Sequence, residues 1–430
     1  MTNPREILIG SFQAALAAAD PLAIVKGHLP VPPAGRTVVV GAGKAAAAMA
    51  AAVESNWPEG AALDGLVITR YGHGLPLRRV RVIEAGHPVP DEAGEAAAKE
   101  ILARASALGE DDLLLVLVSG GGSSLLSLPV EGIAMADLKA VTRDLLASGA
   151  PIQDMNTIRK HLSAIQGGRL ALASRARVLA LVISDVTGDD PTHIASGPCS
   201  PDPTTYGDAI EILSRFGVTA PASIAAHLAK GAAGQVPETP KPGDQGFNRV
   251  ETRVIATAHA SLMAAAAFVQ RRGITPMVLG DSVTGEAREV AKVHAAIARQ
   301  LRLHSHPFKP PVAVISGGET TVTLRGNGKG GRCSEFLLSL AIESGDLDHA
   351  WSLAADTDGI DGAEANAGAI VAPDTLRRAA TLGLDAKKML ANNDGFGFFA
   401  ALGDLVVTGP TLTNVNDYRI ILVLQPSTHA

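Results

Sequence analysis

Two apolar runs in this sequence end in nearly the same glycine turn. Residues 113–118 lead into Ser-Gly-Gly-Gly-Ser-Ser at 119–124, and residues 312–315 lead into Ser-Gly-Gly-Glu-Thr-Thr at 316–321. A buried strand that stops at consecutive glycines leaves backbone N–H groups open to an anion, because no Cβ blocks close approach. The two turns therefore predict two phosphate-binding loops, one in each of two α/β units that face each other across a cleft.

The rest of the chain has the alternation that such units require. Short runs of leucine and β-branched residues alternate with alanine-rich helical stretches, which is typical of βαβ units and a mainly parallel sheet. Strands expected at 37–40, 65–69, 80–84, 113–118 and 178–184 predict a Rossmann-like, doubly wound domain over residues 1–240. The Gly- and Pro-containing segment 231–249 is the expected linker. Strands expected at 254–256, 276–279, 312–315, 320–324 and 351–355 predict a second, smaller mixed α/β domain over 245–430.

Composition limits what the chain binds and where it works. The net charge is −6 and no run rich in Lys or Arg occurs, which argues against a nucleic-acid partner. The only cysteines are Cys199 and Cys333, so neither a disulfide framework nor a thiolate metal site is expected. The first residues lack a signal-peptide pattern, and no apolar stretch approaches the about 20 residues of a membrane span. We therefore expect a cytoplasmic protein with no membrane partner.

A third glycine turn follows the first expected strand and opens a helix. Its residues Gly41, Ala42 and Gly43 fit the loose dinucleotide pattern, and Arg70 after the next strand would accept a 2′-phosphate, so NADP binding stays open. A cation at a helix N-terminus opposes the local dipole unless an anion lies between them. This favours Lys44 as a phosphate or carboxylate contact, with a solvated surface lysine as the alternative. Neither a Walker-type loop nor the protein-kinase motif set is present.

Two acidic turns also follow expected strands. In the first, Asp185, Asp189 and Asp190 would repel one another without a compensating cation, which Mg²⁺ on nucleotide phosphates would supply. The alternative is a network of Asx turns that only shapes the loop. The second turn, at 356–362, has the spacing of a calcium loop without its terminal glutamate, and local turn chemistry is again the alternative.

Basic residues are concentrated among glycines at 325–335. Lys329 and Arg332 stand between four glycines, which predicts a mobile loop that clamps an acidic substrate and excludes water when it closes. A plain hairpin tip is the alternative.

Another basic segment reads Asn-Thr-Ile-Arg-Lys-His at 156–161. It would bring Arg159 or Lys160 to the cleft, or form an amphipathic helix with a solvated basic face. The sequence leaves both interpretations open.

Taken together, these motifs resemble the class II glycerate 2-kinases, also called the MOFRL family, some of whose members carry the label hydroxypyruvate reductase. The matching segments lie in order along nearly the whole chain, at 40–45, 86–91, 119–124, 155–160, 184–189, 328–332, 356–361 and 408–416. The resemblance implies transfer of the γ-phosphoryl group of ATP to the 2-hydroxyl of D-glycerate, with Mg²⁺. It implies a small-molecule substrate and a nucleotide as partners, and leaves a homodimer open.

The resemblance places Lys44 and Arg332 at an interdomain active site. We expect Asp189 and Glu319 to act through Mg²⁺, and Asp185 or Asp189 to be the base for the substrate hydroxyl. Of the two Ser-Gly-Gly turns, the first is expected to hold phosphates, and the second, which carries Glu319, the metal and the acidic substrate. Replacing Lys44 or Arg332 with alanine is expected to abolish activity and leave thermal stability near wild type. The expected binding residues are Gly41, Gly43, Ser119, Gly120, Gly121, Gly122, Ser123, Ser124, Asn156, Lys160, Lys329, Asp356 and Asn414.

The chain departs from the family pattern at two positions: Cys333 and His259 stand where asparagine is common. Two other functions stay open. One is an NAD(P)H-dependent hydroxypyruvate reductase, based on the turn 41–46 and Arg70, although no His–carboxylate pair for protonating an alkoxide is recognisable. The other is a non-catalytic sensor of a phosphorylated metabolite.

Overall fold

The computed structural model describes residues 3–345 and 347–425 and divides the chain into two compact units. One unit spans Pro21–Ile255, and the other joins the first 20 residues to those from Ala256 onward. We expected a division at 240–245 with the N-terminus in the first domain. Two long-range contacts account for the difference. Strand β6 (Val250–Ala256) completes the first sheet, although we expected 254–256 to begin the second domain. Helix α1 (Pro4–Ala17) packs in the second unit, where Phe12 stacks on Tyr418.

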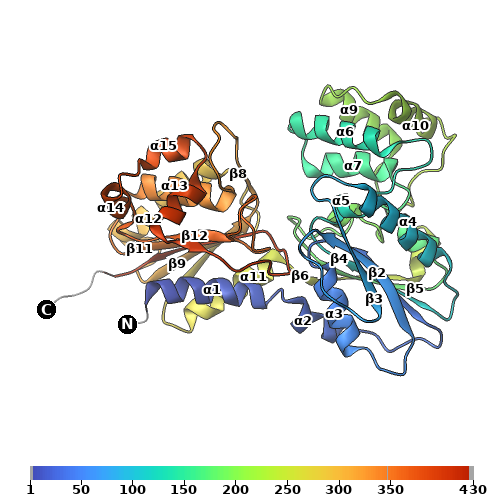
Figure 1. Ribbon diagram of the computed structural model, residues 1–430, viewed down its shortest axis with the longest axis horizontal. Helices are drawn as coiled ribbons and strands as arrows, with labels where there is room; N and C mark the ends of the chain where they lie inside the picture. The colour runs from blue at the N-terminus through green and yellow to red at the C-terminus, as the bar shows by residue number, and fades with distance from the viewer. Residues whose placement is uncertain (1–2, 346, 426–430) are drawn as a thin grey trace. The chain divides into compact units, whose positions relative to one another are not determined.

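The unit Pro21–Ile255 is built on a six-stranded sheet in the order β3-β2-β1-β4-β5-β6 (Figure 1). The pairs β1–β2, β2–β3, β1–β4 and β4–β5 are parallel. Strands β1 and β4 are buried along their whole length, which explains their continuous apolar runs. The chain leaves β1 towards β2 on one side and returns to β4 on the other, so the topological switch point lies between β1 and β4. The other strands are β1 (Thr37–Ala42), β2 (Leu63–Arg70), β3 (Val80–Ala85), β4 (Leu113–Val118) and β5 (Arg177–Ile183).

Four helices of this unit form a separate helical layer that the sequence did not predict (Figure 1). They are α6 (Met135–Ala147), α7 (Ile152–Leu162), α9 (Tyr206–Arg215) and α10 (Ala222–Ala232). Their apolar faces share a small core of their own, including Val141, Ile158 and Leu228. The remaining helices of the unit are α2 (Pro21–Ile24), η1 (Val25–His28), α3 (Ala46–Asn56), α4 (Glu92–Ser106), α5 (Gly122–Leu125), α8 (Arg169–Ala173), η2 (Ile194–Ser196) and η3 (Gln245–Arg249).

The second unit contains a mixed sheet in the order β13-β12-β11-β14-β9-β7. Only β7 and β9 pair in parallel; the other pairs of this sheet are antiparallel. Its strands are β7 (Thr275–Gly280), β9 (Val312–Gly318), β11 (Ala350–Asp356), β12 (Gly368–Val371), β13 (Leu405–Val406) and β14 (Asp417–Val423). The expected strand at 320–324 is shortened to β10 (Thr320–Thr321), which pairs with β8 (Gly285–Glu286).

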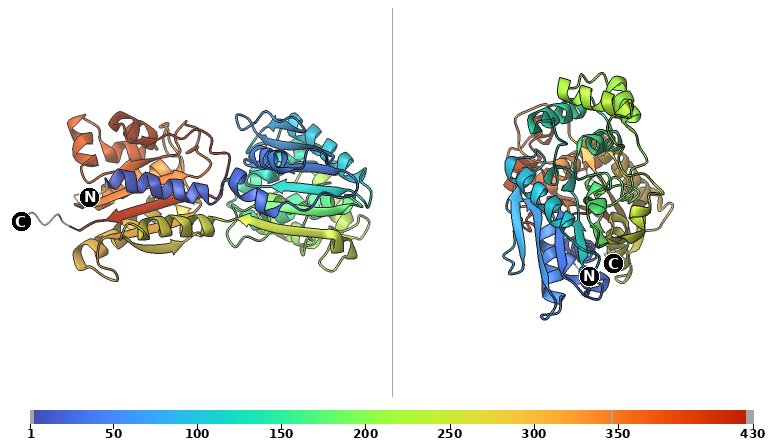
Figure 2. Two further views of the ribbon diagram at one scale, coloured as in Figure 1. Left: turned by 90° about the horizontal axis from the view of Figure 1, so that it is seen from below. Right: turned by 90° about the vertical axis from the view of Figure 1, so that its right-hand side faces the viewer.

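Helices cover both faces of the mixed sheet. Helix α1 and α11 (Ala258–Gln270) lie side by side on one face (Figure 2) and share a core with β9, β11 and β14. The opposite core is formed by α12 (Ala287–His304), α13 (Arg332–Ser344), α14 (Thr375–Thr381), α15 (Ala386–Ala391) and α16 (Gly395–Leu402). The α/β class, with one parallel and one mixed sheet, confirms the predicted fold.

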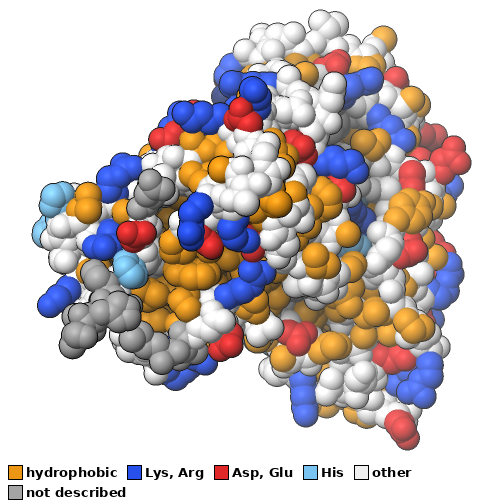
Figure 3. All heavy atoms as spheres, turned by 60° about the vertical axis from the view of Figure 1, so that its left-hand side comes forward, with side chains coloured by type: hydrophobic (Ala, Val, Ile, Leu, Met, Phe, Trp, Pro, Cys, Tyr) orange, Lys and Arg blue, Asp and Glu red, His pale blue; other side chains and the backbone are white. Residues whose placement is uncertain are grey.

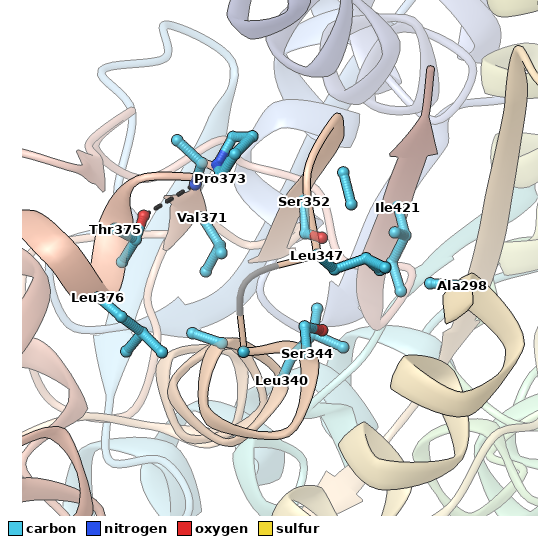
Figure 4. Close-up of a pocket in the computed structure, with 14 residues that line it drawn as sticks. Ala298, Leu340, Ser344, Leu347, Ser352, Val371, Pro373, Thr375, Leu376 and Ile421 are labelled. Atoms are coloured by element: carbon cyan, nitrogen blue, oxygen red, sulfur yellow. Dashed lines mark hydrogen bonds between the residues drawn. The ribbon is translucent and has the colours of Figure 1, made fainter. Parts of the chain in front are cut away.

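A small pocket lies between the end of α13 and the start of α14 (Figure 4). Leu340, Val371 and Leu376 contribute apolar side chains to it, and Thr375 Oγ1 accepts a hydrogen bond from the Ala372 N–H at 2.8 Å. The lining contains no charged side chain, which makes this pocket a packing gap in the core.

In the described part of the chain, no single helix is long and apolar enough to cross a membrane. One bent pair, Pro4–Ala17 with Pro21–His28, reaches that limit by length and composition only.

Candidate functional site

The structure brings two of the predicted glycine turns together at the switch point of the first sheet. The turn after β1 and the turn after β4 are joined by two hydrogen bonds: Lys44 N–H donates to the Gly120 carbonyl at 2.8 Å, and Ala45 N–H donates to Ser119 Oγ at 3.0 Å. A Cβ on Gly43 would lie 2.1 Å from Ser119 Oγ, so only glycine permits this approach. Ligands of open α/β sheets bind in the crevice at this position.

The Ser-Gly-Gly-Gly-Ser-Ser turn has the features of an anion-binding loop. Gly121 has φ +80°, and α5 begins at Gly122. Among the residues that the structure describes, the backbone N–H groups of Gly120 and Gly121 have no hydrogen-bond partner. Free amides next to the Lys44 side chain match the donors that nucleotide phosphates need.

The pKa of His87 reflects the charges around this loop. A Cβ on Gly121 would lie 2.8 Å from His87 Nε2, so the imidazole packs directly against the turn. Burial, reinforced by the charges of Lys44 and Arg70, lowers the pKa of His87 to about 3. The imidazole is therefore neutral at pH 7, and the surroundings of the loop are electropositive.

Asn156 contributes to the site by positioning other groups. Its side chain is buried, and its Nδ2 donates to the His193 carbonyl at 3.0 Å. Ser196 Oγ lies 3.0 Å from both Asn156 Oδ1 and Ser123 Oγ. Asn156 thus connects α7 and η2 to the glycine loop.

Lys160, which we expected to bind a ligand, is paired inside the unit. Its ammonium lies 2.6 Å from Asp202 Oδ1, and the two side chains are 1% and 0% exposed. Since the charge is already neutralised inside the unit, the structure gives Lys160 a structural role. The partner is 42 residues further along the chain, and the local sequence holds no sign of it.

The first acidic turn is shaped by local hydrogen bonds. Asp190 accepts from Thr192 N–H at 2.9 Å, and although burial raises the pKa of Asp190, the bonds from Thr192 lower it below its ordinary value. Asp189 has φ +54° and is partly exposed, and Asp185 is partly buried. The described residues contain no cluster of three or more His, Cys, Asp or Glu that could hold a metal ion. The loop-shaping alternative thus accounts for Asp190, whereas Asp185 and Asp189 stay candidates.

In the second unit, Arg332 is held by three carboxylates. Its Nε donates to Asp417 Oδ1 at 2.6 Å, its Nη1 to Glu319 Oε1 at 2.6 Å and its Nη2 to Asp356 Oδ2 at 2.8 Å. Burial opposes the charge, but these three carboxylates raise the pKa of Arg332 well above its ordinary value. Glu319 is thus an ion-pair partner of Arg332, which differs from the metal ligand that we expected.

Sequence reasoning missed Asp417, which is fully buried at the start of β14. The signal was an acidic residue three positions before the apolar run 420–423.

The second Ser-Gly-Gly motif is not a phosphate-binding turn. Strand β9 continues through it, and Gly317 and Gly318 pair with Tyr418 and Asp417 of β14. Gly318 has φ +110°, and a Cβ there would lie 2.4 Å from the Val283 carbonyl oxygen. The glycines therefore serve sheet packing, and the initial expectation of two phosphate-binding loops was wrong, whereas the expectation that the first turn holds the phosphates stays a prediction.

The basic glycine loop is packed against the turn between α15 and α16, which contradicts the predicted open, mobile loop. A Cβ on Gly326 or Gly328 would lie within 2.6 Å of atoms in Asn392 or Asp394. The Lys329 N–H donates to Asp394 Oδ1 at 3.2 Å, and its ammonium lies 3.3 Å from Glu364. The glycines allow this close contact, which holds the segment before Arg332 in place.

The second acidic turn anchors the helix that carries Arg332. Asp361 is fully buried and accepts the N–H groups of Cys333 and Ser334, both at 2.9 Å, at the start of α13. Burial raises the pKa of Asp361 to about 6.

The other two expected binding residues of this unit lie in buried turns. Asp356 Oδ1 accepts from the Asp358 N–H at 3.0 Å, and Asn414 Oδ1 accepts from the Asn416 N–H at 3.3 Å. Asp356 also contacts Arg332, so it belongs to the arginine site, whereas Asn414 stays a candidate.

The surface carries both signs of charge. On the face shown in Figure 3, Lys and Arg side chains are interspersed with Asp and Glu. This face presents no continuous basic patch of the kind that nucleic acids bind.

Known proteins match the chain along almost its full length. Residues 7–229 match a domain of unknown function, DUF4147, and residues 312–417 match the MOFRL family. The chain is 41% identical to a glycerate 2-kinase of Pyrococcus horikoshii, covering 90% of this chain and 88% of the relative. A crystal structure of glycerate kinase from Thermotoga maritima is 37% identical, covers 98% of this chain and 99% of its own, and superposes with a TM-score of 0.86. The chain belongs to the glycerate 2-kinase family.

A further family member, from Agrobacterium vitis and provisionally named hydroxypyruvate reductase, is 51% identical over 98% of this chain and 95% of the relative. The resemblance inferred from the motifs is thereby confirmed.

Proposed function

We propose that this chain is a glycerate 2-kinase, which transfers the γ-phosphoryl group of ATP to the 2-hydroxyl of D-glycerate. The observation that carries the proposal is the joined pair of glycine turns at the sheet's switch point, with Lys44 and free amides beside it. Relatives named glycerate 2-kinase, 37–41% identical, support the same conclusion. The reductase alternative is not favoured, because that name is provisional in the relatives that carry it.

ATP suits the residues at the switch point. The amides of Gly120 and Gly121 would bind phosphate oxygens, Lys44 would neutralise their charge, and Gly41 and Gly43 would allow the backbone to approach. ATP, when bound, supplies the phosphoryl group. Phosphoryl transfer depends mainly on positioning and charge neutralisation, which such a loop provides. Serine hydroxyls at 119, 123 and 124 line the same turn.

Mg²⁺ would supply further neutralisation of the phosphates. It is usually bound by one or two carboxylates together with phosphate oxygens, so a site does not need a cluster of three acidic residues. The partly exposed Asp189 carboxylate has the chemistry of such a ligand. We propose Asp189 for this role, and Asp185 as the group that accepts the proton of the substrate hydroxyl.

Arg332 is proposed to bind the carboxylate of glycerate or the transferring phosphoryl group. Two of its three partners, Asp417 and Asp356, are buried, whereas the Glu319 side chain is 56% exposed. Glu319 can therefore move away at little cost, and an anionic ligand would take its place at Nη1. The buried pair keeps the guanidinium oriented during this exchange.

A direct assay tests the proposal. We expect ATP- and Mg²⁺-dependent phosphorylation of D-glycerate, with a product that enolase converts without added phosphoglycerate mutase. We expect Lys44→Ala to lose activity and Lys26→Ala, at an exposed lysine in the same unit, to keep it. Oxidation of NADPH by hydroxypyruvate without kinase activity would show the reductase instead, and activity in neither assay would leave a sensor.

The same proposal includes a cytoplasmic enzyme with no nucleic-acid or membrane partner, and a homodimer as its assembly. Cell fractionation tests the location, and sedimentation velocity tests the assembly.

A further inference from the structure

A second pocket lies beside the glycine loop, within the unit Pro21–Ile255. Ser123 and Ser124 of the loop form one wall, and Arg159 of α7 and Lys139 of α6 line it as well. The cavity is small, with a volume of about 20 Å³, and no Asp or Glu is among its lining residues. A cavity of about 10–15 Å³ holds one water molecule, so this one takes the oxygen atoms of a single carboxylate or phosphate group and not a whole metabolite.

The pocket contrasts with the one in the second unit. That pocket (Figure 4) has a similar cavity volume, about 20 Å³, but lacks charged side chains. The pocket beside the glycine loop instead combines two cations with serine hydroxyl groups. A positive lining with hydrogen-bond donors is suited to an anion.

Among the residues that line this pocket, Arg159 says most about what the pocket binds. The hydrogen bond that the structure records for its side chain is from Nη1 to Asn156 Oδ1, at 3.3 Å. Within residues 3–345 and 347–425 its guanidinium forms no ion pair with a carboxylate, and burial lowers its pKa to about 10. It is still protonated at pH 7. A partly buried charge without a counter-ion is unfavourable, so its presence needs an explanation other than stability.

The next residue on α7, Lys160, is an example of a cation with a structural role in this unit. Lys160 is paired with the buried Asp202 carboxylate at 2.6 Å. The fold thus supplies a counter-ion to one of two adjacent cations on α7. The other, Arg159, faces the pocket instead.

We propose that this pocket is an oxyanion subsite, in which Arg159 and the hydroxyl of Ser123 bind a carboxylate or phosphate group of a reactant. Guanidinium binds either group through paired hydrogen bonds. Because Ser123 also belongs to the glycine loop, the subsite continues directly from the phosphate-binding amides. The existence of the subsite does not depend on the proposed kinase reaction; the identity of the reactant rests on it.

The first test is direct anion binding. Inorganic phosphate and D-glycerate, each added alone, should raise the Tm of the wild-type protein, and Arg159→Ala should lose the shift caused by the anion that binds here. Arg159→Lys should keep part of it, because the charge remains while the paired geometry is lost. The matched control is Arg143→Ala, which removes the same charge from an exposed position on α6 and should keep the full shift.

The second test is the stability of the unliganded protein. Since Arg159 lacks a counter-ion, Arg159→Ala should have a Tm equal to or above that of wild type. A lower Tm, or failure of Arg159→Ala to fold, would overturn the proposal, because it would show that the guanidinium serves the fold.

Kinetics then identifies the source of the anion. Loss of charge-assisted hydrogen bonds should raise one KM by about 10- to 100-fold, with a smaller change in kcat. A higher KM for D-glycerate assigns its carboxylate to the subsite, and a higher KM for ATP assigns a phosphate. Unchanged anion-induced shifts together with both KM values within twofold of wild type would refute the subsite. If the wild-type protein has no kinase activity, the proposed function fails, whereas the phosphate-induced Tm shift still tests the subsite.

Discussion

Replacing Lys160 with methionine separates its structural role from the ligand-binding role that the sequence suggested. Methionine keeps most of the side-chain volume and removes the ammonium. Asp202 would keep its bonds from Thr204 N–H, at 3.1 Å, and from Thr204 Oγ1, at 2.7 Å. It would lose the only cation within 3 Å that the structure describes, at 2.6 Å, while remaining fully buried.

The expected loss is large compared with the stability of a domain. Removing one partner of a buried ion pair costs about 3–5 kcal/mol, out of an unfolding free energy of about 5–15 kcal/mol. The double variant Lys160→Met/Asp202→Asn should recover most of the loss, because the uncompensated charge is gone. Lys230→Met, at an exposed lysine on α10, is the matched control and should stay within about 0.5 kcal/mol of wild type.

The pH dependence of this loss of stability has a definite sign. Burial raises the pKa of Asp202, but the charge and hydrogen bond of Lys160 outweigh it and lower the pKa below its ordinary value. The stability that the pair contributes is therefore present above the unfolded pKa of about 3.9 and is lost as pH falls through the lower folded value. In Lys160→Met the carboxyl loses its cation and protonates more readily, so the deficit should be smaller at pH 4.5 than at pH 7.

Urea unfolding followed by tryptophan fluorescence measures the effect. The chain has two tryptophans, Trp57 in the unit Pro21–Ile255 and Trp351 in the other. In a Trp351→Phe background the signal reports the unit that contains Lys160, which matters because two units can unfold separately. A midpoint equal to that of Lys230→Met, combined with a higher KM for a reactant, would refute the structural role and restore the original prediction.

Three further predictions follow from single contacts. Arg332→Ala should abolish activity. It should also lower the unfolding free energy of its unit by about 1–3 kcal/mol, because the buried carboxylate of Asp417 loses a donor. An unchanged urea midpoint of Trp351 fluorescence would instead support the sequence-based expectation of unaltered stability. His87, whose pKa is about 3, stays neutral in the folded state, while the unfolded state protonates below about 6.5. Between pH 6.5 and pH 5, the unfolding free energy of wild type measured by urea titration should therefore fall by about 2 kcal/mol more than that of His87→Gln. Equal losses would contradict the low pKa. Gly43→Ala places a Cβ 2.1 Å from Ser119 Oγ and should weaken ATP binding measured by calorimetry. The control Gly60→Ala, with nothing within 4 Å of the new Cβ, should bind ATP as wild type does. Equal affinities of the two variants would contradict the close packing of the two turns.

Strands β1 to β5 of the first sheet were predictable for a clear physical reason. Strand β4 was expected at 113–118 and is observed at Leu113–Val118, because a parallel strand buried on both faces is a continuous apolar run. Strand β14 was not predicted. Asp417 and Arg419 interrupt its apolar pattern, and they are tolerated inside the sheet because they pair with each other and Asp417 also pairs with Arg332.

The candidate site was predictable in part. Glycine turns after apolar strands pointed to the residues around Lys44, since the end of a parallel strand is where ligands bind. The sequence could not distinguish Lys160 from Arg159, because the partner that neutralises a cation is chosen by the fold. It also predicted an open basic loop, whereas the glycines between Gly326 and Gly331 serve close packing.

The sequence by itself determined the α/β class and membership of the glycerate 2-kinase family, and it predicted phosphate binding at the turn 119–124. These features depend on residue types at short spacing, which local backbone chemistry constrains directly. The tertiary structure decided which of two similar glycine motifs is a loop, which cations are already paired, and to which unit the N-terminal helix belongs. Each of these depends on contacts between residues tens to hundreds of positions apart, such as Phe12 with Tyr418 and Lys160 with Asp202, and such contacts exist only once the chain has folded.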